Sequence, residues 1–255
     1  MRPANYHTHT CFCDGVHAPG ELVAEAIRLG CPELGFSGHS YTAFDSSFCM
    51  SPEGTREYIA AVRGLQESCR EKICIRLGVE QDYYSDAPVD GYDYVIGSVH
   101  YVKKDGCYLS VDESRESQTE YVRRFYHGDY YGFIEDYYKN LADLYRKTRC
   151  QIIGHFDLVK KFNGPGDLFD PQHPRYRAAV DLALEALLQA PVRMEVNMGA
   201  IARGYLTEPY PARDILTRWL AAGKEVLFSS DCHHAQQLLF GYDLYEDFVR
   251  SCREA

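Results

Sequence analysis

Two histidines near the start of the chain, His7 and His9, have the clearest potential for chemistry. They lie in residues 4–10, which read as an extended segment. Side chains alternate between the two faces of a strand, so both imidazoles would point the same way and could bind one metal ion. A lone His-x-His pair is equally compatible with a solvated face, so this metal site needs support from other residues.

That support comes from later apolar runs, which repeatedly end in a side chain of a metal-binding type. The residues at these ends are His39, Glu80, His100, His155, Asp231 and His233, and a further run ends in Glu195-Val196-Asn197. A carboxylate at the end of a buried strand needs a cation or hydrogen-bond donors to offset its desolvation. The pattern therefore predicts one polynuclear metal site, with Glu80 as the natural bridge between two ions.

The remaining histidines are interpreted as ordinary surface or core residues, because a lone histidine is more often one of these than a ligand. They are His17, His127, His173 and His234.

Strand-like and helix-like segments alternate along the chain, which is typical of a parallel α/β fold. Strands are predicted at 4–10, 33–39, 73–80, 92–100, 150–155, 192–197 and 225–231. Helices are predicted at 19–29, 51–71, 114–148, 174–189, 212–222 and 244–254. The third is expected to break at Gly128, and the fourth is expected to have an apolar side formed by Ala178, Leu182, Leu184 and Leu188. In a barrel all strand ends meet at one mouth, whereas the opposite edges of an open sheet cannot reach a common ion. We therefore predict a distorted (β/α)7 barrel, one domain over residues 1–255, with the metal site at the C-terminal ends of the strands.

Composition narrows the possible partners and the compartment. The formal net charge is −10 and the chain has no Lys/Arg-rich block, which argues against binding to nucleic acid or to an anionic membrane. The chain begins without an apolar signal stretch and has no apolar run long enough to span a bilayer. We expect a cytoplasmic protein whose ten cysteines are reduced. Cys11-x-Cys13 lacks the second ligand pair of a zinc thiolate site, although Cys11 follows His9 closely enough to border the cluster.

Seven ordered motifs over nearly the full length carry a family resemblance. They are His7-Thr8-His9 followed by Asp14-Gly15, Gly38-His39, Gly78-Val79-Glu80-x-Asp82-Tyr83, Ile96-Gly97-Ser98-Val99-His100, Gly154-His155-Phe156-Asp157 and Ser230-Asp231-Cys232-His233. In these motifs the chain resembles the polymerase and histidinol phosphatase (PHP) superfamily of metal-dependent phosphoesterases. Within that superfamily it is similar to the histidinol-phosphate phosphatase branch.

The resemblance implies a seven-stranded distorted barrel with three divalent metal ions. By position, His7, His9, Glu80 and Asp231 would hold the first ion, Glu80, His100 and His155 the second, and Asp14, His39 and His233 the third, with His17 as a competitor for Asp14. Glu80, Asp231 and His233 would be catalytic. A mixed imidazole and carboxylate set suits zinc, manganese or iron. Ions that share Glu80 would activate water for in-line attack on phosphorus and stabilise the developing charge.

The resemblance also implies basic contacts for the substrate, a small-molecule phosphomonoester. Either Lys160 or Lys161, together with Arg203, would hold the phosphate, and Asp82 with nearby tyrosines would select the rest of the substrate. The first hypothesis is hydrolysis of L-histidinol phosphate in histidine biosynthesis. The alternatives are a phosphatase or phosphodiesterase of the same superfamily with another substrate, an amidohydrolase, and a non-catalytic metal-binding regulator. Amidohydrolases often use a carboxylated lysine where this chain has Glu80, which counts against that class.

Overall fold

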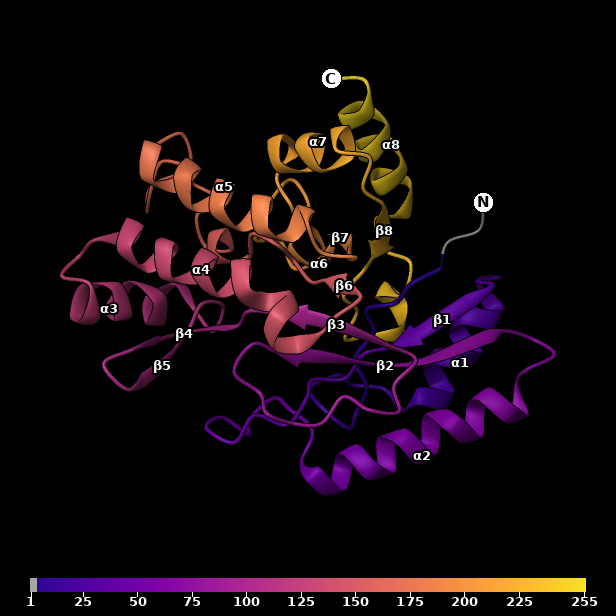
Figure 1. Cartoon of the computed structure of the whole chain (residues 1–255). Coiled ribbons are helices and arrows are strands. Elements are labelled where there is room, and N and C mark those ends of the chain that lie inside the picture. Colours follow the sequence, from indigo (N-terminus) through magenta and orange to yellow (C-terminus); the bar gives the residue numbers. More distant parts are fainter. Residues whose placement is uncertain (1–3) are drawn as a thin grey trace.

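A parallel six-stranded sheet forms the centre of the computed structural model, which describes residues 4–255 (Figure 1). Its strands lie in the order β1-β2-β3-β6-β7-β8, and each pairs in parallel with its neighbour. The strands are β1 (Glu33–Phe36), β2 (Cys74–Asp82), β3 (Tyr94–Ser98), β6 (Ile152–Ile153), β7 (Arg193–Asn197) and β8 (Val226–Ser229). Six of the seven predicted strands are therefore present, with shorter or shifted ends.

The remaining predicted strand, residues 4–10, is not a regular strand, yet it joins the two edges of the sheet. Asn5 forms a parallel bridge with Leu34 of β1, and Thr8 forms a parallel bridge with Cys232, just after β8. The segment thus lies between the first and last strands of the sheet, and residues 4–10 are called the seam below. It closes the sheet into the distorted barrel that converging ligands require.

The side chain of Asn5 takes over much of the pairing at this seam, and it is fully buried. Its Nδ2 donates hydrogen bonds to Ser230 Oγ at 2.8 Å, to the Leu238 carbonyl at 3.0 Å and to Thr8 Oγ1 at 3.2 Å. Its Oδ1 accepts from the backbone N–H of His7 at 3.2 Å. One amide therefore connects the His7 segment to the loop that follows β8.

Asn5→Ala is expected to destabilise the protein by about 1–3 kcal/mol, because it leaves buried donors and acceptors without partners. Denaturant unfolding followed by circular dichroism measures the change in the free energy of unfolding. Gln172→Ala, which removes an amide from an exposed residue, is the control. Equal stability of the two variants would contradict the assigned role of Asn5.

Helices cover the outside of the curled sheet (Figure 1). Helices α1 and α2 pack beside β1 and β2, α4 packs on β3 and on α5, and α7 packs against α8. Their bounds are α1 (Pro19–Arg28), α2 (Pro52–Ser68), α3 (Arg115–Phe125), α4 (Tyr130–Thr148), α5 (Pro174–Leu188), α7 (Arg213–Ala221) and α8 (Tyr242–Arg253). Proline opens α1, α2 and α5, where its fixed φ suits the first helical position. Within residues 4–255, none of the helices combines the length and apolar character needed to cross a membrane.

Several elements at the mouth of the barrel were not predicted. The hairpin β4 (Tyr101–Lys104) and β5 (Cys107–Ser110) follows β3, and the short helices η1 (Leu158–Lys160), α6 (Gly199–Ala202) and η2 (Ala235–Gln237) follow β6, β7 and β8. The hairpin turns at Asp105-Gly106 with φ values of 49° and 81°, the positive values that a two-residue turn requires. These insertions build the walls around the strand ends.

A small apolar cluster fills the barrel beneath these walls. It unites Tyr94 and Ile96 of β3 with Ile152 of β6, Leu227 of β8 and the partly buried Tyr6 of the seam. Side chains from separate strands can meet in this way because the sheet is curled. With the interior packed, the chemistry is confined to the mouth.

Candidate metal centre and active site

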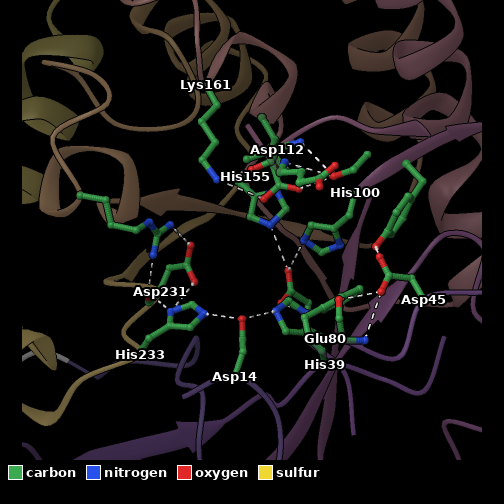
Figure 2. Close-up of a pocket in the computed structure, with 17 residues that line it drawn as sticks. Asp14, His39, Asp45, Glu80, His100, Asp112, His155, Lys161, Asp231 and His233 are labelled. Atoms are coloured by element: carbon green, nitrogen blue, oxygen red, sulfur yellow. Dashed lines mark hydrogen bonds and ion pairs between the residues drawn. The ribbon is translucent and has the colours of Figure 1, made fainter. Parts of the chain in front are cut away.

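The nine predicted metal ligands come together at the carboxyl ends of the strands. They are His7 and His9 of the seam, Asp14 in the turn beyond it, His39 after β1, Glu80 in β2, His100 after β3, His155 after β6, and Asp231 and His233 after β8. Figure 2 shows Asp14 between His233 and His39, with Glu80 beside His39 and with His100 and His155 across the same hollow.

Glu80 occupies the centre of this group and is almost completely buried. Its Oε2 lies 3.1 Å from His7 Nε2 and 3.0 Å from His39 Nδ1. Its Oε1 lies 3.0 Å from His155 Nε2 and 3.4 Å from His100 Nε2. His9 Nε2 also faces Oε2, at 3.5 Å. The two oxygens of one carboxylate therefore face different imidazoles, which is the arrangement that a ligand shared by two ions would have.

Three sets of ligand atoms lie close enough to hold an ion. Within each set the atoms lie within 4.8 Å of one another, and the sets are His9, Asp14, His39 and His233; His7, His9 and Glu80; and His39, Glu80 and His100. The third set has His39 where His155 was predicted, and His155 adjoins it with Nε2 3.0 Å from Glu80 Oε1. Asp231 adjoins the second set, with Oδ1 at 3.4 Å from His9 Nε2 and 3.6 Å from His7 Nε2. His17 belongs to none of these sets among the described residues, and its Nδ1 accepts from the Ala235 N–H at 3.4 Å. The geometry thus favours Asp14 over His17.

Unpaired buried atoms test whether these residues suit a metal. Nε2 of His7, Nε2 of His9 and Oε2 of Glu80 lie in the cluster and are buried without a hydrogen-bond partner. Buried polar atoms normally have such partners, so a cluster of exceptions needs an explanation. Imidazole nitrogen and carboxylate oxygen are ligands that zinc, manganese and iron accept. The residues present therefore fit a metal centre.

The electrostatics of the cluster also favour added positive charge. Burial by itself would lower the pKa of His7, but the carboxylates of Glu195 and Glu80 outweigh it and raise that pKa well above its usual value. Burial, aided by His233 and His39, lowers the pKa of His9 to about 3. Burial would raise the pKa of Glu80, yet the surrounding imidazoles hold it well below its usual value. The buried carboxylates therefore stay ionised and draw protons or metal cations to their neighbours.

A cavity of about 420 Å³ opens onto the cluster. Its lining contains six carboxylates, from Asp14, Asp45, Glu80, Asp112, Glu113 and Asp231, but only two residues with permanent positive charge, Lys161 and Arg203. A phosphate dianion would be repelled by this excess of negative charge unless cations compensated it. The cavity is therefore suited to a phosphoester only when metals occupy the cluster.

Arg203 and Lys161 are held at the cavity wall by acidic partners. Arg203 Nη2 donates to Asp231 Oδ2 at 2.8 Å, and Nη1 donates to the Asp231 carbonyl at 3.2 Å. Gly199 makes this approach possible, because a Cβ there would lie 2.5 Å from Nη2. Lys161 Nζ donates to the Asp112 carbonyl at 2.7 Å. Each cation therefore reaches the cavity in a fixed place.

Two predicted substrate contacts, Lys160 and Asp82, are not in the cavity lining. Lys160 Nζ is 2.9 Å from Asp157 Oδ2 and 3.5 Å from Glu208. Asp82 is buried, and its Oδ2 accepts from the His100 backbone N–H at 3.0 Å and lies 3.2 Å from His100 Nδ1. Asp82 is thus placed to orient a candidate ligand, and Lys161 is the better placed of the two lysines.

Sequence reasoning missed the acidic and aromatic wall of the cavity. Asp45, Asp112 and Glu113 lie in loops, and no periodicity marks them. Tyr101 begins the unpredicted hairpin, and its hydroxyl donates to Asp45 Oδ2 at 2.8 Å. The Asp-Gly pair in the hairpin turn was the only local signal available, and it identifies the hairpin rather than its part in the cavity.

One cysteine side chain lies at the edge of the cluster. Cys11 is exposed, whereas Cys13 is partly buried with Sγ 3.6 Å from His9 Nδ1. Burial raises the pKa of the Cys13 thiol to about 12, so it stays protonated. No disulfide joins any of the ten cysteines, all of which lie within residues 4–255, and Cys13 rather than Cys11 borders the cluster.

Known proteins share both the sequence pattern and the fold. The PHP domain model matches residues 5–199. A Deinococcus radiodurans protein named a probable histidinol-phosphatase is 28% identical, over 97% of this chain and 92% of its own length. A Listeria monocytogenes structure of a candidate histidinol phosphatase has a TM-score of 0.82 at 20% identity, covering 95% of this chain and 99% of that one. A Lactococcus lactis histidinol phosphate phosphatase, solved with zinc, L-histidinol and phosphate, has a TM-score of 0.69 at 19% identity, covering 99% and 94%.

These likenesses in fold confirm the predicted α/β class with a distorted barrel. The matched region spans well over half of the chain and includes seven of the nine clustered ligands. The protein therefore belongs to the PHP domain family.

Proposed function

We propose that the protein hydrolyses L-histidinol phosphate to L-histidinol and phosphate. The observation that carries the proposal is the position of Glu80 among five imidazoles, beside a cavity into which Arg203 and Lys161 project. The name of the Deinococcus radiodurans relative supports it. So does the Lactococcus lactis neighbour, which was solved with zinc, L-histidinol and phosphate.

In this proposal the nine clustered residues hold three divalent ions, zinc, manganese or iron. When bound, such ions would lower the pKa of water to give a nucleophile and would stabilise charge on the phosphoryl oxygens. Glu80, Asp231 and His233 would act as catalytic residues by holding these ions in place beside the phosphorus. Arg203 and Lys161 bind the phosphoryl oxygens, and Asp82 orients His100.

The acidic and aromatic wall of the cavity supports an amino-alcohol ester as substrate. Asp45, Asp112 and Glu113 line the cavity together with the aromatic rings of Phe48 and Tyr101. Histidinol carries an amine and an imidazole, so its cationic form would gain from nearby carboxylates and from the faces of these rings. A neutral or anionic leaving group would gain nothing from the same wall.

Asp45→Asn is expected to raise KM for histidinol phosphate roughly tenfold, the equivalent of about 1.4 kcal/mol for a lost charged contact. Hydrolysis of p-nitrophenyl phosphate, whose leaving group has no amine, should stay within about twofold of wild type. Steady-state kinetics on both esters measures this difference. Asp243→Asn, at an exposed position in α8, is the matched control. Equal losses on the two esters would rule out leaving-group recognition by Asp45.

The proposal as a whole is tested by hydrolysis of a panel that contains histidinol phosphate, a nucleotide, a phosphotyrosyl peptide and an amide. Histidinol phosphate should have the highest kcat/KM, and the activity should vanish on chelation and return with zinc, manganese or iron. Preference for another ester would indicate a different PHP phosphatase, and amide hydrolysis would indicate an amidohydrolase. A fully metallated protein that hydrolyses none of them would be a metal-binding regulator.

We further propose that the protein works in the cytoplasm as one domain. The ten cysteines, which form no disulfide within residues 4–255, support a reducing compartment. The acidic net charge supports a small-molecule substrate over nucleic acid or a membrane surface.

A further inference from the structure

Glu195 is a fully buried carboxylate in β7 that the proposed metal sites do not use. The run that contains it resembles those that end in ligands, but it belongs to none of the three sets of ligand atoms found among residues 4–255. Instead its Oε2 lies 2.8 Å from Nδ1 of His7, on the side of the imidazole away from the cluster. Its place is therefore behind a candidate ligand.

Protein donors also occupy the other oxygen of Glu195. Oε1 accepts from the backbone N–H of His155 at 2.6 Å and from Asn197 Nδ2 at 2.8 Å. An ionised carboxylate only accepts hydrogen bonds, so His7 must present a protonated Nδ1 to it. The opposite nitrogen, Nε2, is then directed to the cluster, where it lies 3.1 Å from Glu80 Oε2.

We propose that Glu195 is a positioning residue that holds His7 in the orientation and tautomer in which Nε2 binds metal. The inference rests on the proposed metal-dependent function, because it takes His7 as a ligand. Histidine ligands commonly donate their other N–H to a carboxylate, which fixes the ring and makes it a better ligand. Through the same carboxylate, Glu195 also fixes the backbone of His155.

Asn197 extends this support to the other side of the cluster. Its Nδ2, which donates to Glu195, is also 3.4 Å from Asp231 Oδ2. Its Oδ1 accepts from the Gly199 N–H at 2.8 Å, at the start of the helix α6 that precedes Arg203. One buried network thus connects the ring of His7 to the carboxylate of Asp231.

Glutamine cannot replace Glu195 without conflict. Its amide has one accepting and one donating atom, whereas the site presents donors to both oxygens. If the amide nitrogen faces His155, it opposes two donors, the backbone N–H of His155 and Asn197 Nδ2, so this orientation is the costlier of the two. If it faces His7, Nδ1 must accept and the proton moves to Nε2, the nitrogen needed for the metal. We expect Glu195→Gln to weaken zinc binding 10- to 100-fold, the range for removal of such a partner.

Two measurements test the proposal without relying on activity. Competition with a chromophoric chelator gives the zinc affinities of wild type, Glu195→Gln and the control Glu225→Gln, which changes an exposed glutamate beside β8. NMR of the zinc-loaded protein with 15N-labelled histidine reports which imidazole nitrogen carries the proton, with His7 assigned from the spectrum of His7→Gln. Wild type should show the His7 proton on Nδ1 and zinc on Nε2. Glu195→Gln should lose this pattern, and Glu225→Gln should keep it.

Unchanged zinc affinity in Glu195→Gln would overturn the proposal, and so would an unchanged His7 spectrum. If that variant does not fold, the wild-type spectrum decides alone, because zinc on Nδ1 of His7 would exclude the proposed role. Failure of the enzyme to hydrolyse histidinol phosphate would instead reject the proposed substrate and leave both measurements valid.

Discussion

Glu80→Gln is expected to leave the purified protein depleted of metal and almost without phosphatase activity. A neutral amide oxygen is a poor ligand, and the change removes the carboxylate that faces five imidazoles. Loss of a partner of a ligand already costs 10- to 100-fold in affinity or activity, so loss of the shared ligand should exceed about a hundredfold. Elemental analysis and steady-state hydrolysis of histidinol phosphate measure the two effects.

Glu185→Gln, at an exposed position of α5, is the matched control and should keep both metal and activity. A full metal complement in Glu80→Gln would refute the bridging role. Loss of activity with all metals retained would restrict Glu80 to a role in the reaction itself.

Arg203→Ala is expected to fold and to keep its metals, yet to lose hydrolysis by roughly one to three orders of magnitude. A guanidinium can bind a phosphate through two parallel hydrogen bonds, and this one is fixed at the cavity wall by Asp231. Removing a cation from beside Asp231 leaves that carboxylate more attractive to a metal ion, so metal content should not fall. Kinetics on histidinol phosphate and elemental analysis measure both quantities.

Arg203→Lys should restore only part of the activity, because an ammonium group lacks the planar fork of donors. Arg177→Ala removes an exposed arginine of α5 and should leave catalysis unchanged. Wild-type efficiency in Arg203→Ala would show that the phosphate is held by the metals and Lys161 alone.

The metal cluster could be predicted because its signals are local. Six of the ligands follow an apolar run, as Glu80 does in β2 and Asp231 does after β8, and parallel strands bring such ends together. Asp14 was expected only from the family resemblance. The irregular seam could not be predicted in the same way. There the side chain of Asn5 replaces part of the strand pairing, through partners more than 220 residues away.

The prediction for helix α5 was right about the helix but wrong about which of its faces is buried. Leu182 and Leu184 are two positions apart, about 200° around a helix, so they cannot both face the core. Leu184 is buried, and Leu182 is 49% exposed. The observed buried face consists of Tyr176, Ala179, Val180, Ala183, Leu184 and Leu187.

The seam at Asn5 and Thr8 has a consequence for biosynthesis. His9 and Asp231 approach within 3.4 Å, although the ribosome joins them to the chain some 200 residues apart. At a synthesis rate of roughly 5–20 residues per second, on the order of 10–40 seconds pass between the synthesis of His9 and that of Asp231. The early segment cannot dock until β8 has left the ribosome, because Thr8 pairs beside that strand. Metal capture by the complete cluster is therefore a post-translational event, and the newly made chain must stay unmetallated or loosely metallated until its last strand is in place.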